Sequence, residues 1–499
     1  MTHQFHLYNS LSRETETVEP LHDSHLQFYS CGPTVYSYAH IGNFRSFLTA
    51  DLIFRTAKSI GWEVTYATNI TDVGHLTDDD IAGTTGEDRM VQALQSKEGE
   101  RFANIWDLAR YYTLVLQEDW RSLNLLEPTV RPRASEHMRE QIKAIEQLLK
   151  SGNAYETSNT IYFSVPSFPA YGRLSGNEAA EDLEQGVRDV VHDPEKQDPR
   201  DFALWKKDDS HLMQWHSPWG WGFPGWHLEC SVMAQTYLGD EIDIHAGGED
   251  LIFPHHECEI AQTECLTGKT FARKWVHTRF LQVEGKKMSK SAGNFYTVRD
   301  LVLPESEGGR GIDPLAVRMT LLSGHYRKPF NFTFETLKTN VRHRQRFDDV
   351  VALAESGLEN GENGQNELSG TLTALFERTL SAMLDDLNTP EALAATFEAT
   401  KVVLKHEHLS KDSASSVIRW LDNTNDLLGI VYPHAPLKTE SGDESFAAEV
   451  DALVAARTQA REENDFTRAD ELRDELTSLG VEVMDTPDGP KWKRRSTLS

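Results

Sequence analysis

Two short segments far apart in the chain carry side chains that suit phosphate chemistry. The first is HIGN at His40–Asn43, and the second is KMSKS at Lys287–Ser291. Imidazole and amide donors in the first, and lysine ammonium groups in the second, can stabilise the negative charge that builds up on phosphate oxygens. The two segments, in this order, predict an enzyme that activates a substrate with ATP.

Apolar periodicity predicts the elements that position the first segment. Leu26–Cys31 reads as a strand, Asn43–Ile60 has apolar residues at helical spacing, and Glu63–Ala67 reads as a second strand. Together they form a βαβ unit, whose helix N-terminus offers free N–H groups to a phosphate. The alternative, that His40 only caps the helix or packs beside it, is left open by the sequence.

The second segment reads as a movable loop. Gly285 precedes it, and Gly293 follows it closely. Such a loop can bring its lysines to the charge that develops on a leaving pyrophosphate. A solvated basic loop is the alternative, and the Met-Ser pair between the lysines argues against it.

Four side chains have the chemistry of a zinc site. Pro254 can begin a helix, in which His255 and Glu259 are four residues apart and share one face. Cys31 ends the first strand, and Cys230 is expected near the carboxyl end of the same sheet. Two thiolates, an imidazole and a carboxylate suit Zn²⁺. Spacing alone leaves open that the cysteines are small buried hydrophobes and that the histidine and glutamate form a surface contact.

Three longer segments resemble the cysteinyl-tRNA synthetases, which are class I aminoacyl-tRNA synthetases. They are Phe28–Tyr36, Gly225–Ser231 and Phe253–Glu259, and the resemblance continues from about residue 5 to the C-terminus. It implies an α/β fold. The expected architecture is a Rossmann-like class I synthetase catalytic domain with an insertion, followed by an α-helical bundle and a small C-terminal anticodon-binding domain.

The resemblance also implies a reaction: ATP-dependent ligation of cysteine to tRNA(Cys) through a cysteinyl-adenylate intermediate. Mg²⁺ is expected to accompany the ATP. The catalytic residues that it implies are His40, Asn43, Lys287 and Lys290, and Lys290 would also bind ATP. The residues expected around cysteine and the adenylate are Thr71, Trp226, His245, Gly247, Gly248 and Asp250.

The family binds zinc at the positions of Cys31, Cys230, His255 and Glu259, so one zinc per chain is expected, with the substrate thiolate as a further ligand. A metal lowers the pKa of a thiol, whereas the serine hydroxyl ionises far less readily. Cysteine can therefore be distinguished from serine without an editing site. Three neighbours are expected to lie off the ligand face or too far along the helix: His256, Cys258 and Cys265.

The end of the chain is implied to contact the anticodon. The positions that match the family are Arg461, Phe466, Asp470 and Asp485. Base stacking by the aromatic ring and acceptance of base amino groups by the carboxylates are physically reasonable. A helical core aromatic and solvated charges are the alternative.

Composition and motifs divide the chain into six expected parts. In chain order these are the first catalytic half with HIGN (1–118), the connective insertion (119–205), the second catalytic half with zinc ligands (206–275), the KMSKS loop and stem-contact region (276–330), the helical bundle (331–438) and the anticodon-binding domain (439–499). Trp215–Trp226 is dense in Trp, Gly and Pro, and it is expected to be rigid and irregular.

The 499 residues carry a formal net charge of −28 and four cysteines. This charge argues against a generally basic nucleic-acid binder, but tRNA needs only a local positive track. Arg342–Arg346 and Lys491–Arg495 are candidate tracks, with a solvated face as the alternative for each. The few cysteines, and the lack of a long apolar run or a signal-peptide pattern, lead us to expect a cytoplasmic protein without a membrane span.

One segment departs from the family pattern, and three rival functions remain. Residues 73–90, after Asn69–Asp72, have an unusual sequence, which puts any role there in doubt. An enzyme that joins cysteine to an amino sugar would lack the anticodon unit. A non-catalytic tRNA-binding protein would be expected to have lost the lysine motif or a zinc ligand. A zinc hydrolase needs an open water position, and four protein ligands leave no obvious one.

Overall fold

The computed structural model describes residues 3–77, 86–176, 194–289, 292–432, 443–462, 465–478, 481–486 and 489–494. The chain forms two compact units. The first comprises Met1–Val298 and Pro314–His434, and the second comprises Arg299–Asp313 and Ala435–Ser499. Each unit is described by itself.

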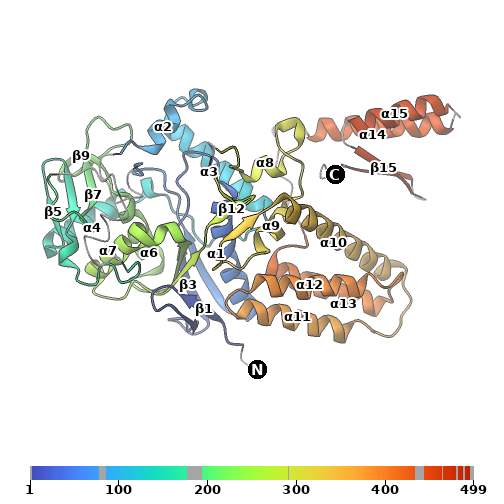
Figure 1. The fold of residues 1–499 in the computed structure, drawn as a ribbon, viewed down its shortest axis with the longest axis horizontal. Helices are drawn as coiled ribbons and strands as arrows, with labels where there is room; N and C mark the ends of the chain where they lie inside the picture. The colour runs from blue at the N-terminus through green and yellow to red at the C-terminus, as the bar shows by residue number, and fades with distance from the viewer. Residues whose placement is uncertain are drawn as a thin grey trace. The chain divides into compact units, whose positions relative to one another are not determined.

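A four-stranded parallel sheet with the order β11-β10-β3-β4 lies in the first unit (Figure 1). Its strands are β3 (His25–Ser30), β4 (Glu63–Thr68), β10 (Ile242–Gly248) and β11 (Ala272–Thr278). Phe28, Ile244 and Val276 on these strands are fully buried, as expected for parallel strands that are covered on both faces. The predicted α/β fold and its βαβ unit are confirmed, with element boundaries shifted by one or two residues.

Three helices connect or precede these strands: α1 (Ile41–Ser59), α6 (Trp226–Leu238) and α7 (Glu257–Thr267). Through α1 the chain passes from β3 to β4, which form one half of the sheet. Through α7 it passes from β10 to β11, which form the other half. The order of the strands therefore reverses between β3 and β10. In open α/β sheets, ligands bind outside the carboxyl ends of the strands at this point. A hairpin of β1 (His6–Asn9) and β2 (Glu14–Thr17) packs beside β11.

Among the described residues between β4 and α6, three helices precede a second sheet, and the first two of them begin before residue 119, where the insertion was expected to start. The helices are α2 (Arg89–Gln95), α3 (Ile105–Ser122) and α4 (Met138–Ser151). The sheet is antiparallel in the order β5-β6-β7-β9-β8, and its strands are β5 (Ala154–Glu156), β6 (Thr160–Phe163), β7 (Phe202–Lys207), β8 (Trp215–Ser217) and β9 (Gly220–Pro224). It extends beyond residue 205, where the insertion was expected to end.

The prediction of an irregular segment at Trp215–Trp226 is wrong. Strands β8 and β9 form a tight hairpin there, because Gly220 adopts φ 111° and allows the turn, and β9 then pairs with β7. Aromatic residues are also typical of strands. The density of Trp, Gly and Pro therefore marked a hairpin.

The second sheet is followed, later in the chain, by a small three-stranded sheet that carries Lys287, the first lysine of KMSKS. Its order is β13-β12-β14, with β12 (Leu281–Val283), β13 (Lys286–Lys287) and β14 (Phe330–Phe332). Between β13 and β14 lie α8 (Val298–Val302) and α9 (Pro314–Leu322). Gly285 adopts φ 74° in the turn between β12 and β13.

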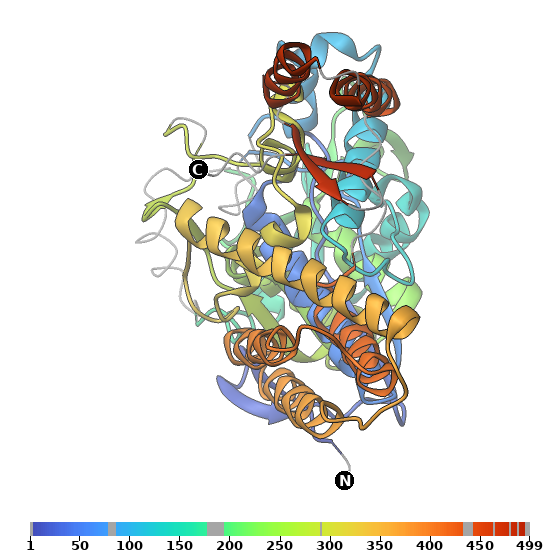
Figure 2. The ribbon, with the colours of Figure 1, turned by 90° about the vertical axis from the view of Figure 1, so that its right-hand side faces the viewer.

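The helical bundle consists of α10 (Phe334–Asn360), α11 (Ser369–Leu384), α12 (Thr389–Val403) and α13 (Lys411–Leu428). Helix α10 packs against α13 and α12, and Figure 2 shows it passing obliquely across the bundle. Phe347 on α10 and Trp420 on α13 are buried and stack with ring centroids 6.3 Å apart. A polar loop was expected between the first two helices, and residues 361–368 connect them.

A buried charge cluster joins the bundle to α1. Asp51 on α1 accepts bonds from Arg55, at 2.9 Å, and from Arg318 on α9. Arg55 also donates to the carbonyls of Asn425 and Asp426, and Arg318 Nε donates to the carbonyl of Leu428 at 2.8 Å. The end of α13 is thus fixed against the helix that begins with HIGN.

The second unit contains α14 (Asp443–Glu462), α15 (Phe466–Ser478) and an antiparallel pair of strands, β15 (Val481–Thr486) and β16 (Gly489–Arg494). Val450, Val454 and Leu476 form its small buried core. The expected pattern of two helices and an extended end is confirmed. Across the described stretches of both units, no helix is both long and apolar enough to cross a bilayer.

Candidate metal centre and phosphate site

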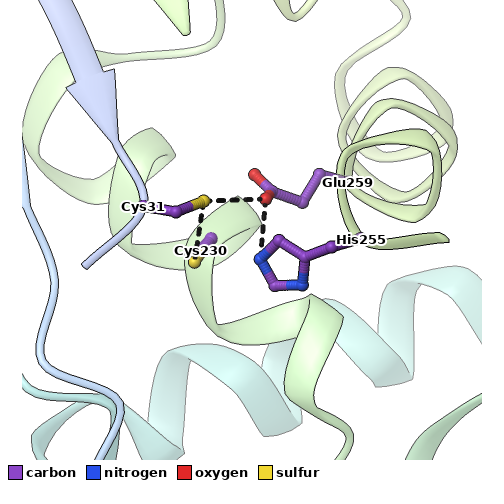
Figure 3. Close-up of side chains that lie close together, drawn as sticks. All are labelled: Cys31, Cys230, His255 and Glu259. Atoms are coloured by element: carbon purple, nitrogen blue, oxygen red, sulfur yellow. Dashed lines mark hydrogen bonds and ion pairs between the residues drawn. The ribbon is translucent and has the colours of Figure 1, made fainter. Parts of the chain in front are cut away.

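Four buried side chains converge at the carboxyl end of the sheet, where the strand order reverses between β3 and β10 (Figure 3). Cys31 directly follows β3, and its N–H donates to the carbonyl of Ala246 on β10. Cys230 lies in the first half of α6, His255 lies in the turn just before α7, and Glu259 lies in the first turn of α7. The structure thus brings the four predicted zinc ligands together from three distant segments, with one ligand atom of each within 4.8 Å of the others.

The distances within this cluster fit a metal-binding group. Cys31 Sγ lies 3.9 Å from Cys230 Sγ and 3.5 Å from Glu259 Oε1, so the two cysteines are not joined in a disulfide. His255 Nε2 lies 3.0 Å from Glu259 Oε1, and its Nδ1 lies 2.9 Å from His227 Nδ1. A hydrogen bond at the other ring nitrogen is the usual way in which a metal-binding histidine is oriented. A Cys₂HisGlu donor set suits zinc.

The protonation states of this cluster are strongly perturbed. Burial raises the pKa of Cys31 well above its usual range, and the nearby Cys230 and Glu259 raise it further. Burial alone would raise the pKa of Cys230 too, but hydrogen bonds from Cys31 and His255 lower it to about 6. Burial also opposes ionisation of Glu259, yet His245 and His255 lower its pKa to about 2. The two thiols and the carboxyl are packed closely together away from water, and a bound cation would stabilise their ionised forms.

A second, overlapping cluster contains two further histidines. His245 Nε2 lies 2.7 Å from Glu259 Oε2, and His256 Nε2 lies 3.3 Å from Cys31 Sγ. Together with Cys31 and Glu259 they also place one ligand atom each within 4.8 Å of the others. His256 Nδ1 in turn lies 2.8 Å from His277 Nε2. The prediction that His256 lies off the ligand face is therefore wrong.

The reason is a local departure from α-helical geometry. The regular helix α7 begins only at Glu257, and Ile252–His256 before it forms a wider π-type turn that contains a non-helical residue, Phe253 (φ −138°, ψ 133°). His255 still meets Glu259 four residues later, but in this wider turn the adjacent His256 also reaches the site. Cys258, which contacts the Tyr171 hydroxyl at 3.5 Å, and Cys265 lie outside both clusters, as expected.

The wall beside the clusters is aromatic. Trp226 lies between His75, at 4.1 Å and nearly parallel, and His255, at 4.2 Å. Thr71 is buried and accepts a hydrogen bond from Asn69 Nδ2 at 2.9 Å. His75 belongs to the segment that was left in doubt and was not predicted. Its position close after Thr71 was the only available sequence signal.

Glycines permit close approach at the ends of the strands. A Cβ on Gly32 would lie 1.7 Å from the carbonyl oxygen of Asn69. A Cβ on Gly247 would lie 2.7 Å from the ring of His256, and one on Gly248 would lie 2.3 Å from Asp250 Oδ1. The predicted positions Gly247, Gly248 and Asp250 therefore lie together at the carboxyl end of β10, next to the clusters.

HIGN and the lysine segment are neighbours in space. His40 is the N-cap of α1: its Nδ1 accepts from the N–H of Asn43 at 3.1 Å, and Asn43 Oδ1 accepts from the N–H of His40. A Cβ on Gly42 would lie 3.3 Å from Cε of Met288, so KMSKS reaches the start of α1. Lys287 is exposed on β13, and Lys290 lies outside the described residues.

The capping alternative for His40 is thus also observed, and it does not exclude a phosphate role. The capping bonds use one ring nitrogen and fix the ring at the positive end of the helix dipole. The N–H of Ile41 donates to Tyr296, just after the lysine segment, at 3.0 Å. Helix start and lysine loop are therefore held side by side.

The predicted anticodon positions lie in the second unit. Arg461 is exposed in the last turn of α14, and Asp470 is exposed on α15. Phe466 begins α15 and Asp485 lies on β15, but their side chains are outside the described part of the structure. The placement of these four residues leaves their role a prediction.

Three family models match the chain. They describe a class I (C) tRNA synthetase catalytic domain at residues 17–342, a DALR domain at 380–432 and a cysteinyl-tRNA ligase anticodon binding domain at 443–492. The last match begins at the first described residue of α14 and ends within β16.

Curated relatives match over nearly the full length. A cysteine–tRNA ligase of Salinibacter ruber is 56% identical over 511 residues, which cover 99% of each chain. Those of Chlorobaculum tepidum and Porphyromonas gingivalis are 39% and 38% identical and cover at least 98% of this chain and 99% of their own.

Solved structures share the fold at low identity. The methionyl-tRNA synthetase of Mycobacterium tuberculosis in complex with methionyl-adenylate has a TM-score of 0.56 at 14% identity and covers 82% of this chain and 92% of its own. The ternary LeuRS–tRNA–LeuAMS complex from Agrobacterium radiobacter K84 has a TM-score of 0.59 at 10% identity, covering 81% and 84%.

Proposed function

The chain belongs to the cysteine–tRNA ligases, a family of class I aminoacyl-tRNA synthetases, and from this membership we propose that it joins cysteine to tRNA(Cys) in two steps. The carboxylate of cysteine first attacks the α-phosphate of ATP, which forms cysteinyl-adenylate and releases pyrophosphate. A hydroxyl of the terminal ribose of the tRNA then attacks the adenylate carbonyl and displaces AMP.

The observation that supports this function best is the buried cluster of Cys31, Cys230, His255 and Glu259 beside Trp226, at the switch point of the sheet. Its donor set suits zinc. It also lies outside the carboxyl ends of the strands, where open α/β sheets bind their ligands. We assign one zinc to these four residues. When bound, zinc supplies a Lewis acid that stabilises the thiolate of the substrate, which serine cannot match.

The residues around the cluster orient the amino acid. Trp226, held between His75 and His255, presents a flat apolar wall for the short cysteine side chain. Thr71 offers a polar group whose orientation is fixed by Asn69. His245 contacts Glu259 at 2.7 Å and so fixes the carboxylate. A tight, pre-ordered pocket of this kind favours a small substrate.

The nucleotide is proposed to lie between α1 and the end of β10. His40 and the N-terminus of α1 would meet its phosphates, while Gly247 and Gly248 let the adenylate approach the backbone. Asp250 would contact the adenylate, and Lys287 and Lys290 would stabilise the pyrophosphate as it leaves. Mg²⁺ is proposed to accompany ATP, as is general in phosphoryl chemistry.

The anticodon is proposed to bind the second unit, where Arg461, Phe466, Asp470 and Asp485 are the candidate contacts. This unit supports tRNA ligation over the rival that joins cysteine to an amino sugar, because that rival lacks such a unit. The retention of the metal-binding set and of KMSKS argues against a non-catalytic relative. A cytoplasmic location is part of the proposal.

Amino-acid-dependent exchange between ATP and pyrophosphate, followed by charging of a tRNA(Cys) transcript, tests the function. Exchange that depends on cysteine at least a thousandfold more than on serine is expected, with charging of this tRNA alone. Exchange that serine supports as well as cysteine would refute the substrate assignment. Exchange without charging would refute the tRNA partner.

A further inference from the structure

The segment after Thr71 supplies a ring that backs the candidate cysteine pocket. The imidazole of His75 is buried and stacks on the indole of Trp226, with ring centroids 4.1 Å apart and ring planes within 8° of each other. His255, one of the four candidate zinc ligands, lies against the same indole at 4.2 Å. Trp226 thus lies between His75 and the candidate metal centre, and His75 itself belongs to neither metal cluster.

A hydrogen bond fixes the orientation of the His75 ring. Its Nδ1 lies 2.6 Å from the hydroxyl oxygen of Thr34. Stacking alone would leave the imidazole free to turn in its own plane, whereas this bond holds it. Thr34 in turn pairs through its backbone with Thr71. One imidazole therefore connects Trp226 to the backbone beside Thr71, which are two of the residues expected around the bound cysteine.

The backbone that carries His75 is also held in place. The N–H of Arg89 donates to the carbonyl of His75 at 3.1 Å. Gly74 adopts φ 75°, and a Cβ there would lie 2.7 Å from the carbonyl oxygen of Pro224, two residues before Trp226. A larger residue at position 74 would collide at this close approach. The turn with His75 is therefore packed directly against the chain that leads into α6.

A ring packed behind the indole determines how far the indole can move. Protein interiors are close-packed, so a side chain is displaced only where a neighbour leaves space. Removal of the His75 imidazole would leave a cavity behind Trp226, into which the indole could withdraw. The pocket would then accept a bulkier amino acid, although all four candidate zinc ligands are unchanged.

We propose that His75 is a positioning residue that sets the size of the cysteine pocket by holding Trp226 in place. The inference rests on the proposed function and deepens it. Zinc selects the thiol, and the stack of His75 on Trp226 excludes larger amino acids that also carry a thiol. One methylene too many in a fitted apolar pocket costs about tenfold or more in kcat/KM. A purely structural role for His75 is the competing explanation.

The experiment compares five full-length proteins: the wild type, His75→Ala, His75→Phe, Thr34→Val and the control His325→Ala. The control removes another imidazole that stacks on an aromatic ring, here Tyr326, with ring centroids 5.0 Å apart. The kcat/KM of exchange between ATP and pyrophosphate is measured with cysteine, with serine and with L-penicillamine, which is cysteine with two methyl groups on its β-carbon. Zinc content and thermal unfolding are measured on the same preparations.

His75→Ala should lower the preference for cysteine over L-penicillamine about tenfold, because the indole can withdraw from an added methyl group. The preference for cysteine over serine and the zinc content should stay at wild-type values, since the metal still binds the thiol. His75→Phe keeps a flat ring behind the indole and should retain most of the discrimination. Thr34→Val removes only the hydrogen bond and should shift the preference in the same direction by a smaller factor.

An unchanged preference for cysteine over L-penicillamine in His75→Ala would overturn the inference, as would an equal fall in the control. A joint loss of zinc and of the preference over serine would show a structural role and would overturn it too. If His75→Ala does not fold, Thr34→Val decides in its place, and a wild-type preference in that variant would count against the inference.

These outcomes leave the proposed function standing, because the wild type would still activate cysteine. A wild-type protein without cysteine-dependent exchange would instead refute the proposed function.

Discussion

In the metal centre, the ionisation of Glu259 is set by the side chains around it. Glu259 is buried, which disfavours its charge, yet His245 and His255 hold its pKa at about 2. It stays ionised at neutral pH and is ready to bind a cation. The two overlapping clusters share Cys31 and Glu259. The assigned cluster adds Cys230 and His255, and the other adds His245 and His256.

Zinc content separates the two clusters. We expect about one zinc per wild-type chain and a strong loss in Cys230→Ala, because this variant removes a ligand of the assigned cluster. His245→Ala should keep most of its zinc, although more weakly bound, because His245 acts through Glu259. Elemental analysis after dialysis measures both, and Cys258→Ala serves as a control with full zinc content. Loss in His245→Ala alone would assign the metal to the other cluster.

Lys290 is expected to act on the transition state of adenylate formation. Its removal in Lys290→Ala should cost about 2–4 kcal/mol of transition-state stabilisation, the usual effect of one preorganised contact to developing charge. Rapid-quench measurement of adenylate formation gives the rate directly, and the affinity for cysteine should change little. A normal rate with weakened cysteine binding would contradict this role.

At the scale of elements, the strands and helices around the sheet were predictable and the turns were not. The period of apolar residues in Asn43–Ile60 identified α1, and the resemblance located the four ligands. Spacing failed at His256, because a π-type turn changes which residues share a face. It also failed for His75, since stacking on Trp226 joins segments about 150 residues apart in the chain. Such contacts have no local signature.

Helix α1 is expected to depend on its buried carboxylate. Burial alone would raise the pKa of Asp51, but Arg55 and Arg318 lower it below its ordinary value. The stabilisation is therefore fully present above the unfolded-state pKa of about 4 and is lost as the pH falls through the lower folded-state value.

The variant Asp51→Asn should lose about 3–5 kcal/mol in the free energy of unfolding at pH 7, because it leaves two buried guanidinium groups without their counter-charge. Denaturant unfolding monitored by circular dichroism measures the loss at pH 7 and in a series of lower pH values. The difference between wild type and variant should shrink towards low pH. A difference that is independent of pH would argue that packing, and not the charge, is lost.

At the scale of the whole molecule, we expect the first unit to form the adenylate and the second unit to be needed for tRNA charging. Deletion of residues 440–499 should leave cysteine-dependent exchange intact and strongly reduce charging of tRNA, because the residues proposed for the reaction site belong to the first unit. Both activities are compared on a truncated protein whose thermal unfolding remains cooperative. If both activities fall together, the second unit serves stability; undiminished charging would refute its role in tRNA binding.

The charge cluster at the end of α13 has a consequence for how such enzymes can be recombined. Arg55 and Arg318 bind the bundle through main-chain carbonyls at Asn425, Asp426 and Leu428, which every sequence provides. A chimera could therefore import a foreign bundle with few matching side chains at this joint. It could not import one whose last helix is a residue longer or shorter, because one residue turns the helix by about 100° and swings the acceptors away. The joint therefore constrains the length of α13 and requires a glycine after it, because a Cβ on Gly429 (φ 65°) would lie 2.8 Å from Arg318.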